Sequence, residues 1–201
     1  MSRVLLSGIS LCTYEQLLDD YNERGSVHFA FDHGDLEITV IGFAQAALQQ
    51  ILTLLVNLWA EESGIKVHGV GSMTLRRHDL ACGLEPDRSF YIRNEELVRG
   101  KPDIDLVTDP PPDLVVIIDI VSPSLNKFPI FAALGIPEVW RYDGERVSIW
   151  KLETHDYHEL AESQLLPSVT GAVLTELLEA GRQMKRTAWL RRVRNWARQS
   201  R

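Results

Sequence analysis

The spacing of apolar and polar positions predicts a chain of alternating strands and helices. Residues 27–42, VHFAFDHGDLEITVIG, alternate apolar and polar side chains on either side of His33-Gly34, which predicts a β-hairpin. Between residues 43 and 63 the polar residues instead recur at every fourth position, which predicts a helix with one solvated face that ends at Gly64. The residues of that face are Gln45, Gln49, Thr53, Asn57 and Glu61.

The rest of the chain follows the same two periods. Residues 13–23 predict a short helix with Thr13 as its N-cap, and residues 68–77 and 86–94 predict strands. Residues 111–124, PPDLVVIIDIVSPS, predict a buried strand because Leu, Val and Ile are dense there. A short helix within residues 126–138 and a hairpin that turns at Asp143-Gly144 follow, and from residue 169 the pattern is helical. These elements together predict a mixed α/β (α+β) fold, with a central sheet flanked by helices.

Composition and charge narrow the class of protein. The length of 201 residues favours one domain over residues 1–168, with a helical tail, residues 169–201, packed on it. The 45% hydrophobic and 24% charged content excludes extensive disorder, and the net charge of −7 argues against a general nucleic-acid coat while leaving room for a local basic surface. Cys12 and Cys82 fit neither a metal spacing nor a disulfide framework, which favours a cytoplasmic protein. Polar residues interrupt the apolar stretch 46–60, so we expect a surface helix and no membrane span.

Two aspartates in the predicted strand 111–124 need an explanation, because burying an unpaired carboxylate is costly. Asp113 and Asp119 are about 20 Å apart along a strand that rises about 3.3 Å per residue, so they cannot bind one ion. Asp113, which follows two prolines, is expected to be a turn or strand-edge residue. Asp119 is either an ion-paired core carboxylate or, with an acid from a neighbouring strand, a ligand of a divalent cation.

Three further residues are candidates for the same site. The sequence EPDRSFYI repeats the order of PPDLVVII, with proline and aspartate before an apolar strand, so Asp87 is the expected second acid. Glu37 is a third acid within an apolar alternation. Lys127 lies just beyond the strand that holds Asp119, where its charge could stabilise a phosphate oxygen, or where it could equally be a surface lysine at a helix start.

The tail is basic. No acidic residue occurs between Arg182 and Arg201, and Trp189, Val193 and Trp196 form one apolar stripe of a helix. Such a helix either contacts the DNA backbone or docks through its tryptophans on the domain or on a second subunit, and we favour docking because the acidic protein offers its own anionic partners.

The stretches GSMTLRRHDLACGLEPDRSFYIRNE, DPPPDLVVIIDIVSPS and FPIFAALGIPEVWRYDG follow one another in this order. They resemble a large bacterial family of putative restriction endonucleases in the PD-(D/E)XK nuclease superfamily, and the resemblance extends over residues 13–152. It implies a restriction-endonuclease-like core, a mixed central sheet between helices, with Mg²⁺ (or Mn²⁺) held by acids from two adjacent strands. It also implies hydrolysis of DNA phosphodiester bonds by a metal-activated water, and association as a homodimer.

The resemblance assigns roles to individual residues. Asp87 matches the first metal-binding aspartate of the family, Glu37 matches an acid of the N-terminal hairpin, and Lys127 matches a basic residue beyond the second strand. The position of the second metal-binding carboxylate, a glutamate in related chains, falls on Ile117, and Asp119 stands where the superfamily has its lysine.

Because isoleucine cannot bind Mg²⁺, two functions remain open. The first is an endonuclease with Asp87 and Asp119 as metal ligands, assisted by Glu37 and Lys127. The second is an inactive relative that binds DNA or acts as an oligomeric partner.

Overall fold

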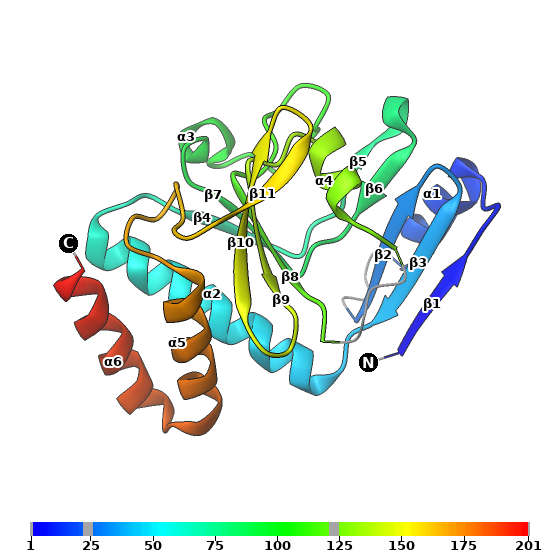
Figure 1. Ribbon diagram of the computed structural model, residues 1–201. Helices are drawn as coiled ribbons and strands as arrows, with labels where there is room; N and C mark the ends of the chain where they lie inside the picture. The colour runs from blue at the N-terminus through cyan, green and yellow to red at the C-terminus, as the bar shows by residue number, and fades with distance from the viewer. Residues whose placement is uncertain (1, 22–25, 121–124, 201) are drawn as a thin grey trace.

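The computed structural model describes residues 2–21, 26–120 and 125–200, and it contains two β-sheets with helices packed around them (Figure 1). The five-stranded sheet is antiparallel and has the order β1-β3-β2-β6-β5. Its strands are β1 (Ser2–Leu6), β2 (Val27–Asp32), β3 (Asp35–Val40), β5 (Leu75–Arg77) and β6 (Cys82–Leu84). The second sheet has six strands in the order β11-β10-β9-β8-β7-β4. Its strands are β4 (His68–Gly71), β7 (Arg88–Tyr91), β8 (Leu114–Ile118), β9 (Glu138–Tyr142), β10 (Val147–Glu153) and β11 (Asp156–Leu160).

Six α-helices and one short 3₁₀ helix are present in the described part of the chain. They are α1 (Leu11–Tyr21), α2 (Phe43–Ser63), α3 (Glu95–Val98), α4 (Phe128–Ala133), α5 (Gly171–Gln183), α6 (Arg186–Gln199) and the 3₁₀ helix η1 (His78–Leu80). The mixed α+β fold, with sheets flanked by helices, is confirmed. The predicted single sheet is in fact two, because the expected strand 68–77 divides after Gly71, whose φ of 70° breaks the extended backbone.

The predicted hairpin forms as β2 and β3, with His33 and Gly34 at its turn in left-handed conformations. Helix α1 covers one face of this hairpin, where Tyr14 stacks on Phe31 with a ring-centroid distance of 4.8 Å. The opposite face of β3 carries Glu37, which therefore lies on the side of the sheet away from α1.

The buried strand β8 forms the middle of the six-stranded sheet, and all five of its residues are buried. Leu114, Val116 and Ile118 face the apolar core under α2 and α5, whereas Val115 and Ile117 face the core beneath α4. Strand β8 pairs in parallel with β9, and the connection between them contains α4. Such a parallel pair needs a crossover, and this crossover brings Lys127, the N-cap of α4, back to the end of β8.

The tail packs on the rest of the chain, as the docking interpretation predicted (Figure 1). Trp189 and Val193 are buried, and Trp196 contacts Trp59 of α2 with a ring-centroid distance of 4.3 Å. Several arginines of α6 form ion pairs with acids of α2 and α5: Arg192 with Glu176, Arg194 with Glu61 and Glu62, and Arg198 with Glu62. These arginines are neutralised by the chain itself.

Helix α2 is long and apolar enough to cross a membrane by length and composition. Half of its most apolar 18-residue stretch is buried against the six-stranded sheet and the tail, as is usual for a core helix.

Candidate active site

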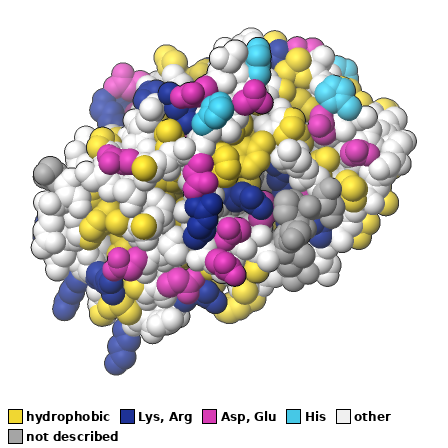
Figure 2. Space-filling model, in the orientation of Figure 1, with side chains coloured by type: hydrophobic (Ala, Val, Ile, Leu, Met, Phe, Trp, Pro, Cys, Tyr) yellow, Lys and Arg dark blue, Asp and Glu magenta, His cyan; other side chains and the backbone are white. Residues whose placement is uncertain are grey.

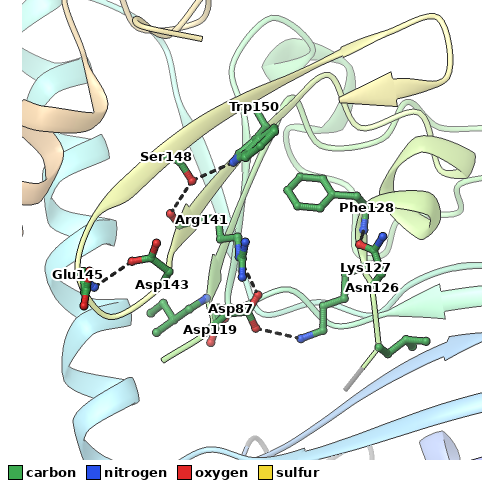
Figure 3. Close-up of polar contacts among 12 residues, drawn as sticks. Asp87, Asp119, Asn126, Lys127, Phe128, Arg141, Asp143, Glu145, Ser148 and Trp150 are labelled. Carbon is green, nitrogen blue, oxygen red and sulfur yellow. Dashed lines mark hydrogen bonds and ion pairs between the residues drawn. The ribbon is translucent and has the colours of Figure 1, made fainter. Parts of the chain in front are cut away.

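The candidate residues meet where the end of β8 approaches the five-stranded sheet. Arg3 and Glu37 come from the five-stranded sheet, Asp87 and Ile117 from the six-stranded sheet, and Lys127 from the start of α4. These five residues line one small cavity of about 10 Å³, which is room for about one water molecule. Figure 3 shows Lys127 and Arg141 pointing toward the carboxylate of Asp119, just after β8.

Asp87 is held by three hydrogen bonds from protein donors. The side-chain amides of Gln45 and Gln49 both donate to its Oδ1, at 2.7 and 2.6 Å, and the backbone N–H of Ile118 donates to its Oδ2 at 2.7 Å. The Asp87 residue is only 6% exposed. Its carboxylate thus joins α2 to the end of β8, and both of its oxygens are engaged.

The polar stripe of α2 explains this arrangement. The stripe was predicted to face solvent, but Gln45 and Gln49 are buried, and Thr53 accepts a hydrogen bond of 3.0 Å from the guanidinium of Arg88. The prediction was wrong about this part of the stripe because a four-residue spacing shows that polar side chains share a face, not which surface the face meets. The spacing of Gln45 and Gln49 was therefore visible in the sequence, but the sequence did not show that both amides bind Asp87.

Ile117 lines the same small cavity as Asp87. The Asp87 carboxylate is turned toward Gln45 and Gln49 of α2. The hydrocarbon side chain of Ile117, 3% exposed, packs instead in the core beneath α4, so this position offers no oxygen ligand.

Asp119, just after β8, is an ion-paired carboxylate. Its Oδ1 lies 3.2 Å from Arg3 Nη2 and 3.6 Å from Lys127 Nζ, and its Oδ2 lies 3.3 Å from Arg141 Nε. Its backbone N–H donates to the carbonyl oxygen of Tyr142 at 2.8 Å, which fixes the residue beside β9. Of the two interpretations of Asp119, the observed contacts are those of the ion-paired core carboxylate.

Glu37 shares two of these cations. Its Oε1 lies 3.1 Å from Lys127 Nζ and 3.5 Å from Arg3 Nε, and its Oε2 accepts a hydrogen bond of 3.1 Å from the backbone N–H of Leu125. Lys127 and Arg3 each bridge Glu37 and Asp119, which lie on different sheets. The alternative of a surface lysine is therefore excluded for Lys127, whose side chain is 14% exposed.

The residues as arranged do not fit a Mg²⁺ ion. Mg²⁺ requires oxygen ligands in octahedral geometry and keeps several of its waters, whereas this cavity holds about one. The carboxylates of Asp87, Asp119 and Glu37 are turned to protein donors, and the described residues contain no group of three His, Cys, Asp or Glu placed to hold a metal. The role of Asp87 and Asp119 as a metal pair stays a prediction.

Asp113 is a strand-edge residue, as predicted. Its Oδ2 accepts hydrogen bonds from the backbone N–H groups of Ile92 and Asn94 at 2.7 and 3.0 Å, and its Oδ1 accepts one from the Asn94 side chain at 3.0 Å. It holds the end of β7 and takes no part in the site.

Three further residues at or beside the site, Arg3, Arg141 and His28, were not predicted from the sequence. The ring of His28 lies 3.0 Å from the Ser72 hydroxyl, and burial lowers its pKa, while the negative charges of Asp87 and Glu85 act in the opposite direction. A single histidine or arginine in an alternating stretch carries no signal for a site, because its partners lie on other strands.

Comparison with known proteins identifies a family and a similar fold. The model of a protein family described as Uma2, putative restriction endonuclease, matches residues 12–186. Among solved structures, the chain is similar to a putative nuclease of the DUF820 family from Anabaena variabilis, with a TM-score of 0.52 and 13% identity over 85% of this chain and 99% of that one. At this identity the likeness shows a common fold. No curated protein matches the sequence.

Proposed function

Because the chain belongs to the Uma2 family of putative restriction endonucleases, we propose that it binds nucleic-acid phosphates at this site without hydrolysing them through a bound metal. The observation that carries the proposal is that Ile117, in the cavity that it shares with Asp87, is an aliphatic side chain packed in the core beneath α4. A metal-activated water needs an ion held by oxygen ligands, and an aliphatic side chain supplies none.

Two cations beside Asp119 support phosphate binding. Lys127 and Arg141 meet at Asp119, and Arg141 is the more accessible, with 29% of its side chain exposed. A phosphate oxygen can replace a carboxylate oxygen as the partner of such cations, because both form charge-assisted hydrogen bonds. Figure 2 shows basic and acidic side chains mixed near the middle of the face in view, so this face is not uniformly basic.

The net charge of −7 opposes nucleic-acid binding at long range. We therefore expect the affinity to depend on few phosphate contacts and to fall with added salt.

The second candidate is the Mg²⁺-dependent endonuclease. It is favoured by the convergence of Glu37, Asp87 and Lys127 on one cavity, with Asp119 in contact with Lys127. This function requires the cations that now pair with Glu37 and Asp119 to move away from them.

Plasmid nicking in Mg²⁺ or Mn²⁺ separates the two functions. Our proposal expects the natural chain to cut no faster than Asp87→Ala, whereas Ile117→Glu gains cleavage that the double variant with Asp87→Ala loses. Ile117→Gln is the matched control, because it has the shape of glutamate without its charge. Cleavage by the natural chain that disappears in Asp87→Ala would establish the endonuclease and refute our proposal.

Binding is tested by fluorescence anisotropy with a labelled DNA duplex over a series of salt concentrations. Lys127→Met and Arg141→Met should each weaken binding and reduce the slope of log K against log salt by about 0.9, the value for one phosphate contact. Lys151→Met is the matched control, because Lys151 pairs with Glu153 on β10, away from the pocket. Equal slopes for all three variants would exclude this pocket as the phosphate site.

A further inference from the structure

Three aromatic side chains lie beside the cations at the end of β8. Phe128, the first residue of α4, contacts Trp150 of β10 and Tyr157 of β11, each with a ring-centroid distance of 5.2 Å. Figure 3 shows two of these side chains, Phe128 and Trp150, next to each other. All three residues are half-buried at the margin of the core beneath α4, so part of the surface of each is open to solvent.

The six-stranded sheet places Trp150 and Arg141 on one of its faces. In the register of β9 and β10, Arg141 lies opposite Ser148, and Trp150 is two positions further along β10, so the three side chains point to the same side. Trp150 Nε1 donates a hydrogen bond of 2.8 Å to the Ser148 hydroxyl, which donates one of 3.3 Å to the backbone carbonyl oxygen of Arg141. These bonds fix the indole ring beside the strand that carries Arg141.

The start of α4 closes the arrangement from the other side. Lys127 directly precedes Phe128, and its Nζ lies 3.6 Å from Asp119 Oδ1, while Arg141 Nε lies 3.3 Å from Asp119 Oδ2. Two cations and three aromatic rings therefore adjoin each other around the end of the sheet. We call this set the aromatic–basic surface: Lys127, Phe128, Arg141, Trp150 and Tyr157.

We propose that the aromatic–basic surface binds single-stranded DNA, whose bases stack on Phe128, Trp150 and Tyr157 while its phosphates contact Lys127 and Arg141. The inference rests on the proposed function, because it uses the same two phosphate contacts and names the kind of nucleic acid that they hold. Cations that follow the backbone, beside aromatic side chains on which bases stack, are the usual means of binding a single strand.

The aromatic rings favour a single strand over a duplex. In a duplex each base is stacked between its neighbours and paired with the opposite strand, so its flat face cannot reach a protein side chain. The bases of a single strand are free to turn toward Phe128 and Trp150 without this cost. A duplex would use only the two cations of the surface.

Stacking also supplies affinity that does not depend on charge. The net charge of −7 repels a polyanion, and both cations of the surface already pair with Asp119. A base that stacks on an aromatic ring needs no ion pair, and every base has a flat face that stacks. We therefore expect the bases to contribute more of the affinity than the phosphates do.

The first test compares three labelled probes on the natural chain by fluorescence anisotropy. They are an oligothymidylate of about ten nucleotides, an abasic oligonucleotide with the same number of phosphates, and a duplex of the same length. The oligothymidylate should bind at least about tenfold more tightly than the abasic chain and the duplex. Equal affinity for the oligothymidylate and the abasic chain, or tighter binding of the duplex, would overturn the inference.

The second test locates the stacking with Phe128→Leu and Trp150→Leu. Each substitution should weaken the binding of the oligothymidylate by about five- to hundredfold, without a change in its salt dependence, and leave the abasic chain unaffected. Trp196→Leu is the matched control, because Trp196 packs on Trp59 in the tail. Folded variants that bind the oligothymidylate as the natural chain does would overturn the inference.

Tryptophan fluorescence gives a measurement that needs no destabilising variant. Trp59, Trp140 and Trp189 are buried, whereas Trp150 is half-buried at the surface. The oligothymidylate should therefore quench the fluorescence of the natural chain, and Trp150→Phe, which keeps an aromatic ring, should lose most of this quenching. Binding without quenching, or quenching that persists in Trp150→Phe, would place the bases elsewhere and overturn the inference.

The two proposals fail in different ways. If Lys127→Met and Arg141→Met reduce the salt slope but the bases make no difference, the phosphate site stands and the single-strand inference is overturned. If the salt slope is unchanged in both variants, the proposed function is refuted whatever the bases contribute, and the inference that rests on it falls with it.

Discussion

Replacing Asp87 by alanine tests whether this carboxylate is a structural acceptor or a metal ligand. The substitution removes the acceptor of three buried donors: the Gln45 and Gln49 amides and the Ile118 backbone N–H, all at 2.6–2.7 Å. Leaving a buried donor without a partner costs about 1–3 kcal/mol. The two glutamine side chains can rotate toward other partners, but the backbone N–H cannot. We therefore expect Asp87→Ala to lower the free energy of unfolding by about 3 kcal/mol.

The assay is urea unfolding followed by the fluorescence of the five tryptophans, in EDTA so that no divalent ion contributes. The unfolding midpoint should fall while the denaturant slope m is unchanged, because the folded state stays compact. Asp156→Ala is the control, since Asp156 is exposed on β11, and its effect should be within about 0.5 kcal/mol.

An increase in the free energy of unfolding on Asp87→Ala would refute the interpretation of Asp87 as a structural acceptor. A carboxylate placed to bind a metal is destabilised by neighbouring acids when the metal is absent, so its removal stabilises the fold. An Asp87→Ala variant that is as stable as the natural chain or more so, together with stabilisation of the natural chain by Mg²⁺, would show that Asp87 is a ligand.

Three further predictions concern the periphery of the site and the tail. Burial lowers the pKa of His28 below its ordinary value of 6.5, so the unfolded chain binds a proton there that the folded chain does not. The free energy of unfolding should therefore fall as the pH drops below about 6.5, and His28→Gln should remove this part of the pH dependence in urea titrations. A double-mutant cycle of Trp59 and Trp196 to alanine should give a coupling of about 0.5–1.5 kcal/mol, and a coupling of zero would contradict their ring contact. Arg198→Met should leave the salt dependence of DNA binding unchanged, because this arginine pairs with Glu62; a smaller slope would make α6 part of the nucleic-acid surface.

The predicted elements that proved correct depend on neighbours along the chain. The β2–β3 hairpin follows from the alternation around His33-Gly34, the buried β8 from its run of aliphatic residues, and the docked tail from the stripe that contains Trp189. The environment of each element was harder to predict. Helix α2 was correctly placed, but its polar stripe faces Asp87 and Arg88 because the six-stranded sheet occupies that side.

The sequence by itself determined where most of the strands and helices form, because the apolar period and the turn residues act over a few positions. It also determined one chemical fact about the site: the side chain at position 117 contains no oxygen. Only the tertiary structure decided which charges meet. Arg3 and Asp119 are 116 residues apart, and the ion pair between them exists because β1 and β8 belong to sheets that approach each other there. Each carboxylate has many possible cations in the chain, and sheet pairing and the crossover through α4 select its partners.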